Sequence, residues 1–272
     1  MLRDRVIVAL LVLPPVFWVI TVGGWPFALT VALVACFAVA EFGMLYRGQR
    51  LRPAVPLMVA GVLVLLAARH LSGFGSTPTL LAGLCLIGVT WHLVDYELGA
   101  ERSGTDFAIT LTGTVYVGWL AAYLISLRQL PDGKWWVLLA LPTTWLADTA
   151  AYFVGRAIGR HRMSPRLSPK KTWEGYLAGV VGGALGGGGL GLLWNLWAGP
   201  ESLVNGVHGL VLGLAIGGLS PLGDLGISMI KREVGVKDTG NLIPGHGGAL
   251  DRIDSILWAG VLGFYLAGVL AS

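Results

Sequence analysis

Charged residues are scarce in this chain. Only 12% of its 272 residues are Asp, Glu, Lys or Arg, whereas 55% are hydrophobic, and the mean hydropathy is +0.73. Soluble domains are typically about a quarter charged, so this chain has too few charges to cover the surface of a soluble globule. The scarcity excludes a soluble enzyme, a nucleic-acid-binding domain and a disordered protein.

Cysteine is also scarce. Cys36 and Cys85 both lie in apolar runs, so we expect two buried thiols rather than a disulfide framework or a cysteine metal site. The chain contains no G-x-x-x-x-G-K-[ST] sequence. It is therefore not a P-loop nucleoside triphosphatase.

Long apolar runs, by contrast, recur along the whole chain. A helix needs about 20 residues to cross a bilayer. We therefore predict an all-α, polytopic integral membrane protein with about nine transmembrane helices in a single membrane domain, 1–272. The expected spans are 6–23, 26–46, 54–71, 78–96, 107–127, 135–155, 175–198, 203–223 and 253–270. The first run lacks a small-x-small cleavage site, so we expect an uncleaved helix rather than a signal peptide.

Basic residues divide unevenly between the two ends of these spans. With the N-terminus in the cytoplasm, only Arg69, Arg128 and Lys134 of the 19 Lys and Arg fall on the far side. Cytoplasmic loops of membrane proteins are enriched in Lys and Arg. The pattern predicts a cytoplasmic N-terminus and a C-terminus on the far side. From the compact size and the lack of further targeting sequence we expect the inner (plasma) membrane of a bacterium.

Glycine is abundant, with 41 residues, and is densest in the span 175–198. Small residues let helix backbones approach closely in lipid. We expect tight helix packing there, and the glycine-rich spans favour a homodimer.

Four acidic residues fall inside or at the inner edge of predicted spans, where a charge costs roughly 2.5–3.5 kcal/mol. We expect Glu41 to snorkel or to pair with Arg47, and Asp95 to be exposed at the interface. For Asp148 the sequence supports structural pairing and a role in a site equally. For Asp224 it favours a role in a site. All four acids lie toward the cytoplasmic ends of their helices. This predicts a polar cavity open to the cytoplasm, not a path through the membrane.

Asp224 begins a helical pattern. Ser228, Lys231 and Arg232 follow at i+4, i+7 and i+8, so all four side chains should project from one helix face. An acid, a hydroxyl and two cations on one stripe indicate a metal-and-phosphate site, although a solvated helix end would look similar.

The first cytoplasmic loop contains Ser168-Pro169-Lys170-Lys171. Ser followed by Pro is typical of a helix start, with Ser168 as N-cap and Pro169 at the first helical position. Lys170 and Lys171 in the first turn of that helix would suit a phosphate. Simple attraction of basic residues to anionic lipid is the alternative.

The second cytoplasmic loop is more specific. Its run 244–248 is rich in glycine, whose freedom to adopt positive φ favours a nest of free backbone N–H groups. Asp251 and Asp254 follow at i, i+3 at the start of the last span, where helix capping is the alternative role. Acids, cations and a glycine-rich turn together indicate a divalent metal that holds a polyphosphate.

The motifs of these loops resemble the signature of phosphatidate cytidylyltransferases, the CDP-diacylglycerol synthases. The resemblance covers about 130–255, the core of a catalytic half 131–272, whereas the N-terminal helices 1–130 match only in hydrophobic character. Ala249 stands where the family usually has a larger apolar residue, which is a packing change. The matching runs are Asp148-x-x-Ala151-Tyr152-x-x-Gly155-Arg156, Ser168-Pro169-Lys170-Lys171-Thr172-Trp173-Glu174-Gly175, Ser228-x-x-Lys231-Arg232-x4-Lys237-Asp238 and His246-Gly247-Gly248-x-x-Asp251-Arg252-x-Asp254.

The resemblance implies an integral membrane enzyme of phospholipid synthesis. It would join CTP and phosphatidate at the cytoplasmic membrane face, with Mg²⁺, to give CDP-diacylglycerol and pyrophosphate. Charge neutralisation and positioning should dominate such a reaction, because both substrates are anionic. The resemblance also favours a homodimer, and the number of acids leaves room for a second, monovalent cation.

The resemblance also suggests roles for individual residues. Asp224 and Asp251 would hold Mg²⁺, with Asp254 secondary. The phosphates would be clamped by Lys170, Lys171, Lys231, Arg232 and Lys237. His246 and the Gly247-Gly248 backbone would line the nucleotide site, and Asp238 would be a ligand or the partner of Lys237. The substrate-binding set is completed by Asp148, Ser168, Ser228 and Arg252.

Two other readings stay open. One is a different CTP-using membrane enzyme: a cytidylyltransferase for another lipid phosphate, or a CTP-dependent kinase of a lipid alcohol. The more remote one is a transporter, whose charged residues should lie near the midplane, often in broken helices of paired repeats. Here the charges crowd one face and no internal repeat is visible.

Overall fold

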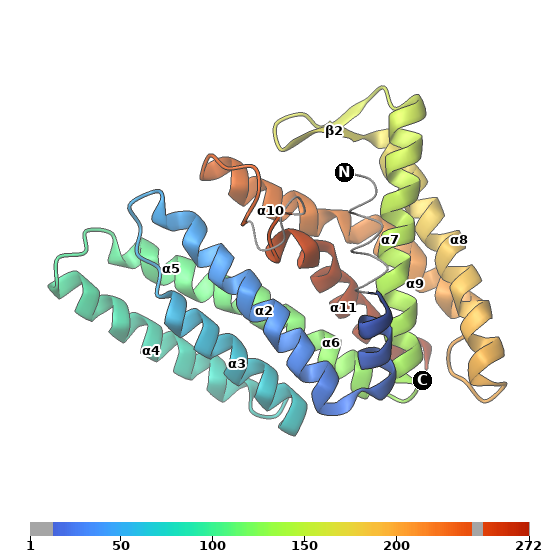
Figure 1. Ribbon diagram of the computed structural model, residues 1–272, viewed down its shortest axis with the longest axis horizontal. Coiled ribbons are helices and arrows are strands. Elements are labelled where there is room, and N and C mark those ends of the chain that lie inside the picture. The colour runs from blue at the N-terminus through green and yellow to red at the C-terminus, as the bar shows by residue number, and fades with distance from the viewer. Residues whose placement is uncertain (1–12, 241–246, 272) are drawn as a thin grey trace.

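The fold is a bundle of long helices with one short hairpin (Figure 1). The computed structural model describes residues 13–240 and 247–271. The helices are Leu13–Val22, α2 (Gly24–Arg47), α3 (Val55–Ser72), α4 (Thr77–Glu97), α5 (Ser103–Gly113), the π-helical turn η1 (Thr114–Trp119), α6 (Leu120–Gln129), α7 (Gly133–Ile158), α8 (Trp173–Ala198), α9 (Gly206–Leu219), α10 (Pro221–Glu233) and α11 (Leu250–Leu270), and the strands are β1 (Arg162–Ser164) and β2 (Ser168–Thr172).

Eight of the predicted spans are helices long and apolar enough to cross a membrane, with α5, η1 and α6 forming one span and α9 with α10 another. This confirms the all-α, polytopic membrane fold. The first predicted span is described only from residue 13, as the helix Leu13–Val22, and its earlier residues lie outside the described part of the chain. The eighth differs from the prediction because helix continues beyond 223, after a change of helix at Ser220.

Several helices have basic residues at one of their two ends. Arg47, Arg156 and Lys231 lie in the last turns of α2, α7 and α10, and Arg102 precedes α5. Figure 1 shows these helix ends on the same side of the bundle as the hairpin. We call this side the basic end. The helix ends predicted to face the cytoplasm therefore lie on one side of the fold.

The cations of the opposite end have structural partners. The Arg69 guanidinium is buried 3.4 Å from the centre of the Phe74 ring. Arg128 donates hydrogen bonds to the carbonyl oxygens of Ile20 and Thr21, at 2.7 and 3.0 Å. Cation–π contacts and carbonyl capping explain why these charges stand outside the general pattern.

The glycines of α8 pack against neighbouring backbones. A Cβ on Gly187 would collide with the carbonyl oxygen of Gly209, and a Cβ on Gly213 with that of Gly183. The expected tight packing is confirmed, since only residues without a Cβ allow α8 and α9 to approach this closely. These faces are occupied within one chain, so the glycines give no support to a homodimer.

The expectation of two buried thiols is wrong for Cys85. Cys36 is half-buried, but Cys85 is exposed on α4. The reason is the position of α4, which lies at the edge of the bundle in Figure 1 and buries few of its residues.

Candidate functional site

A cavity of about 980 Å³ opens at the basic end, among α7, the hairpin, α8, α9, α10 and α11. Its lining combines charges of both signs from distant parts of the chain. The acidic lining residues are Asp148, Asp224, Asp251 and Asp254, and the basic ones are Arg156, Arg160, Arg162, Lys170 and Lys171. The predicted polar cavity is thus present, and its size is that of a small-molecule site.

Helix α10 carries one side of the site. Asp224 accepts a hydrogen bond from the Ser228 hydroxyl at 3.3 Å, as the i, i+4 spacing predicts. The Lys171 ammonium, from β2, lies 2.5 Å from the other oxygen of the Asp224 carboxylate. This ion pair ties the hairpin to α10 across the mouth of the cavity.

Lys231 lies two turns further along α10. Its side chain is buried, and its ammonium contacts Asp251 Oδ1 at 2.6 Å. Arg232, predicted on the same stripe, instead donates to the carbonyl oxygen of Val236 at 3.1 Å and is exposed. Residue i+8 is rotated about 80° from i on a helix, and this offset directs Arg232 toward the loop after α10.

The second oxygen of Asp251 is satisfied by the chain itself. Asp251 Oδ2 accepts from the N–H and the hydroxyl of Thr239, each at 2.9 Å, and from the Gly248 N–H at 3.2 Å. Gly247 adopts φ +76°, the conformation expected of the glycine-rich turn. The nest hypothesis required a free Gly248 N–H. This N–H instead donates to the Asp251 carboxylate and is not free to bind an anion. His246 lies outside the described residues.

Asp254 and Asp148 complete the acidic lining. Asp254 is buried, and its Oδ1 accepts from the Ser255 N–H at 2.6 Å. Gly223 on α10 lets the two helices meet here, since a Cβ would collide with the carbonyl oxygen of Asp254. Asp148 projects from α7 and is exposed to the cavity, close enough to interact electrostatically with Lys171 and Asp224.

The first of the two loops predicted to be cytoplasmic differs from its predicted structure. Ser168 does not cap a helix, because residues 168–172 form β2, paired antiparallel with β1 so that Ser164 lies opposite Ser168. Helix α8 begins at Trp173, and its N-cap is Thr172, whose hydroxyl accepts from the Gly175 N–H at 3.2 Å. Strand pairing holds the segment from Ser168 extended, so the helix begins only after it and is capped by Thr172, the last residue of β2.

This hairpin supplies the basic wall. Lys170 and Lys171 line the cavity from a strand rather than from a helix start. Glu174 anchors the base of the hairpin, accepting from the Arg160 N–H at 3.1 Å and contacting His161 Nδ1 at 2.6 Å. Ser168 is not among the residues that line the cavity in the described part of the chain.

Eight other predicted site residues are not among those that line the cavity in the described part of the chain: Ser228, Lys231, Arg232, Lys237, Asp238, Gly247, Gly248 and Arg252. Lys237, Asp238 and Arg252 are exposed, whereas Lys231 lies behind Asp251, with which it is paired. Sequence reasoning in turn missed Arg156, Arg160 and Arg162 as lining residues. Their signal was the high density of arginine between α7 and β2.

The expectation for Glu41 is wrong. Glu41 is buried, and its Oε2 accepts from the Leu250 N–H at 2.9 Å and the Thr239 hydroxyl at 3.1 Å. It forms no ion pair with Arg47 in residues 13–240 and 247–271, because the helix turns Glu41 inward while Arg47 is exposed. Asp95 is partly exposed, as expected, and lies 3.4 Å from His92 Nδ1.

The donor set suits Mg²⁺ in kind, because hard cations prefer carboxylate and hydroxyl oxygens. However, no three His, Cys, Asp or Glu side chains among the described residues lie close enough to hold a metal. Asp224, Asp251 and Asp254 line one cavity, yet Lys171 and Lys231 are paired with two of them. Metal binding by this set therefore requires that these ion pairs open.

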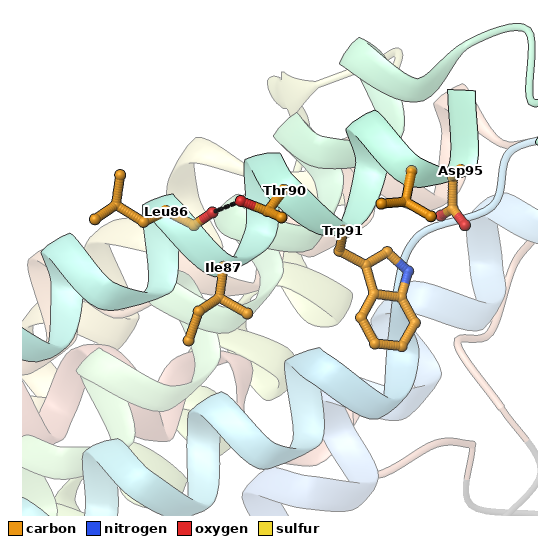
Figure 2. A pocket seen from close by; sticks show the side chains of 6 residues that line it. Leu86, Ile87, Thr90, Trp91 and Asp95 are labelled. Carbon is orange, nitrogen blue, oxygen red and sulfur yellow. Dashed lines mark hydrogen bonds between the residues drawn. The ribbon is translucent and has the colours of Figure 1, made fainter. Parts of the chain in front are cut away.

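A second hollow, of about 510 Å³, runs along α4 (Figure 2). Leu86, Ile87 and Trp91 project from one helix, and Figure 2 shows the Thr90 hydroxyl bound to the Leu86 carbonyl oxygen, at 2.7 Å. Asp95 is the one ionisable residue among the six that line it. This hollow is lined from a single helix and is mostly apolar, so it lacks the cluster of opposite charges found in the cavity at the basic end.

Comparison with known proteins adds independent evidence. A sequence profile described as "Cytidylyltransferase family" matches residues 3–270. A protein of Synechocystis sp. named phosphatidate cytidylyltransferase is 35% identical over 98% of this chain and 97% of its own length. Proteins of the same name from Brucella suis and Bacillus subtilis are 34% and 29% identical, over 99% and 94% of this chain and 94% of their own lengths.

Proposed function

The chain belongs to the cytidylyltransferase family, and from that premise we propose that it transfers the cytidylyl group of CTP to phosphatidate. A phosphate oxygen of phosphatidate bonds to the α-phosphorus of CTP. The bond from that phosphorus to the bridging oxygen of the β-phosphate breaks, and pyrophosphate leaves. The products are CDP-diacylglycerol and pyrophosphate, and the names of the relatives support this choice of substrates.

The observation that carries the proposal is the charge arrangement of the cavity at the basic end. Five basic residues from α7, the hairpin and the segment between them line one cavity with four acids from α7, α10 and α11. The basic wall suits the phosphates of two anionic substrates, which would otherwise repel each other. Positioning by fixed charges is the main contribution a protein makes to phosphoryl chemistry of this kind.

The residues divide by role. Lys170 and Lys171, with the arginines that line the hairpin wall, bind and orient the triphosphate. Lys231, freed from Asp251, neutralises charge that develops on the leaving pyrophosphate. Asp224, Asp251 and Asp254 would hold Mg²⁺, which supplies charge neutralisation on the triphosphate when bound.

The position of the cavity suits a lipid substrate. It lies at one end of the bundle, where helices that cross the membrane meet the polar hairpin. The acyl chains of phosphatidate can remain in the bilayer while the headgroup reaches the cavity. The excess of Lys and Arg supports a cytoplasmic location for this end. The bacterial sources of the similar proteins support the inner membrane of a bacterium.

The test uses purified protein in mixed micelles with phosphatidate, Mg²⁺ and CTP labelled at the α-phosphate. We expect label in the lipid phase and an equal amount of pyrophosphate in the water. Release of CDP without label in lipid would mean phosphorylation of a lipid and would refute cytidylyl transfer. Diacylglycerol and a polyprenyl phosphate, tested in place of phosphatidate, distinguish the other lipid acceptors.

A matched pair of variants links the activity to the cavity. Asp251→Asn keeps the size of a lining side chain but removes its charge, whereas Glu97→Ala removes an exposed acid at the basic end of α4. We expect no measurable transfer with the first and wild-type transfer with the second. Equal activities of the two variants would show that the reaction takes place elsewhere.

A further inference from the structure

Glu41 connects the N-terminal helices to the candidate active site. It lies on α2, yet its Oε2 accepts from the Thr239 hydroxyl at 3.1 Å and from the Leu250 N–H at 2.9 Å, which are 198 and 209 residues further along the chain. The motifs that resemble the family do not include it. A Cβ on either Gly240 or Gly248 would collide with the Glu41 carboxylate. The chain at Gly240 and at Gly248 is therefore closely fitted around this side chain.

Glu41 acts as the cap that α11 itself lacks. The N-cap residue of α11 is Ala249, which has no side-chain acceptor. The Leu250 N–H at the start of this helix is instead bound by Glu41. A carboxylate at a helix N-terminus is favoured by the hydrogen bond and by the helix dipole. These two effects explain how a buried acid is tolerated with no cation paired to it in the described part of the chain.

Thr239 links Glu41 to Asp251 of the candidate site through hydrogen bonds. Its hydroxyl lies 3.1 Å from Glu41 Oε2 and 2.9 Å from Asp251 Oδ2, and its N–H also donates to Asp251. A hydroxyl has one proton, so the two carboxylates share a single donor and their positions are coupled. Asp251 lies in the first turn of α11, the turn that Glu41 caps.

A second contact from α2 supports the same loop. The side chain of Gln49, just after α2, donates to the carbonyl oxygen of Val234 at 3.0 Å, where α10 ends. The basic end of α2 therefore contacts the loop near its start at Val234 and at its end at Leu250. These contacts hold the described residues at the two ends of the loop, whereas Lys237 and Asp238 between them are exposed.

We propose that Glu41 is a positioning residue of the active site: it caps α11 and holds Thr239, so that Asp251 faces the cavity. Its role is indirect, because it does not line the cavity within residues 13–240 and 247–271. The proposal rests on the proposed function only for its kinetic consequence. The structural consequence, a loop held by Glu41, can be measured without any activity.

The kinetic test compares Glu41→Ala, Glu41→Gln and the control Glu97→Ala in the micelle assay. We expect Glu41→Ala to lower kcat/KM roughly tenfold to hundredfold, the usual effect of removing a residue that orients a functional ligand. Glu41→Gln should restore activity to within about fivefold of wild type, since its amide oxygen can accept the same bonds, although more weakly. Glu97→Ala should match wild type.

The structural test is hydrogen–deuterium exchange on the same proteins. In Glu41→Ala we expect faster exchange in peptides that cover 234–254, including the amides of Thr239, Gly248 and Leu250, and no change in peptides of α4. Faster exchange throughout the protein would mean that Glu41 serves only global stability, and it would overturn the proposal. So would a folded Glu41→Ala protein with wild-type exchange in 234–254 or with wild-type activity.

A second variant covers the case in which Glu41→Ala does not fold. Thr239→Val removes the shared hydroxyl but keeps the shape of the side chain. Its effect on kcat/KM should be non-additive with that of Glu41→Gln, because both act on one chain of hydrogen bonds. Strictly additive effects would refute the coupling. If the wild type itself transfers no cytidylyl group, the proposed function fails, and the exchange experiment alone decides the role of Glu41.

Discussion

The two lysine–aspartate pairs of the site should differ strongly in their contribution to stability. Lys231 and Asp251 are 11% and 13% exposed with a separation of 2.6 Å, whereas Lys171 and Asp224 are 28% and 37% exposed at 2.5 Å. The distances are nearly equal, so the difference comes from burial. Replacing each lysine by methionine removes the charge and keeps most of the side-chain volume.

The expected magnitudes follow from what each substitution leaves behind. Lys231→Met leaves the Asp251 carboxylate without its cation, which typically costs about 3–5 kcal/mol for a buried pair. Hydrogen bonds from Thr239 and Gly248 remain on Asp251 Oδ2, so we expect the lower end, about 3 kcal/mol. Lys171→Met removes a pair that water already screens and should cost no more than about 1 kcal/mol.

The assay is equilibrium unfolding of each variant in mixed detergent micelles, followed by tryptophan fluorescence. The double variant Lys231→Met/Asp251→Asn provides the control, because it removes the unpaired charge but keeps an oxygen that can accept from Thr239 and Gly248, and so should recover most of the loss. Equal losses for the two single lysine variants would refute the reasoning from burial. A double variant less stable than Lys231→Met alone would show that Asp251 is stabilised by its other partners and not by Lys231.

Three further predictions follow from the fold and the site. Asp224→Asn should abolish cytidylyl transfer while the protein still inserts and folds, and near-normal transfer at limiting Mg²⁺ would refute its assignment to the metal. Gly187→Leu should prevent the close packing of α8 against α9 and lower the midpoint of unfolding strongly, whereas an unchanged midpoint would contradict the backbone contact. Thr172→Ala should destabilise the start of α8 by about 1 kcal/mol, while Ser168→Ala should have little effect; the reverse order would mean that the helix begins at Ser168.

The sequence alone was sufficient to predict the membrane fold and a charged cavity at one end of it. Apolar runs of bilayer length predict spans because every backbone polar group in lipid must be bonded within its own helix. Asp224, Lys231 and Asp251 could be chosen as site residues because their charges are costly near a bilayer and because their spacing matches a family signature. The basic end could be predicted because the charge bias between alternate loops depends only on the order of the spans.

Several local predictions failed because they needed partners distant in sequence. Ser168-Pro169 has the local pattern of a helix start, but pairing with residues 162–164 makes it a strand. The Gly248 N–H was expected to be free, but it donates to Asp251. Arg232 was assigned to the stripe of Asp224, but its rotation on α10 directs it toward Val236.

Glu41 shows both what the sequence predicts and what only the tertiary structure decides. The sequence indicates that an acid stands in a span, and hydropathy explains why such an acid must be satisfied. Only the packing of α2 against the loop and α11 decides that its partners are Thr239 and Leu250, not Arg47. Spans and charge bias follow from the interaction of each segment with the solvent or lipid around it, whereas hydrogen-bond partners depend on which segments meet, and that is decided by the tertiary structure.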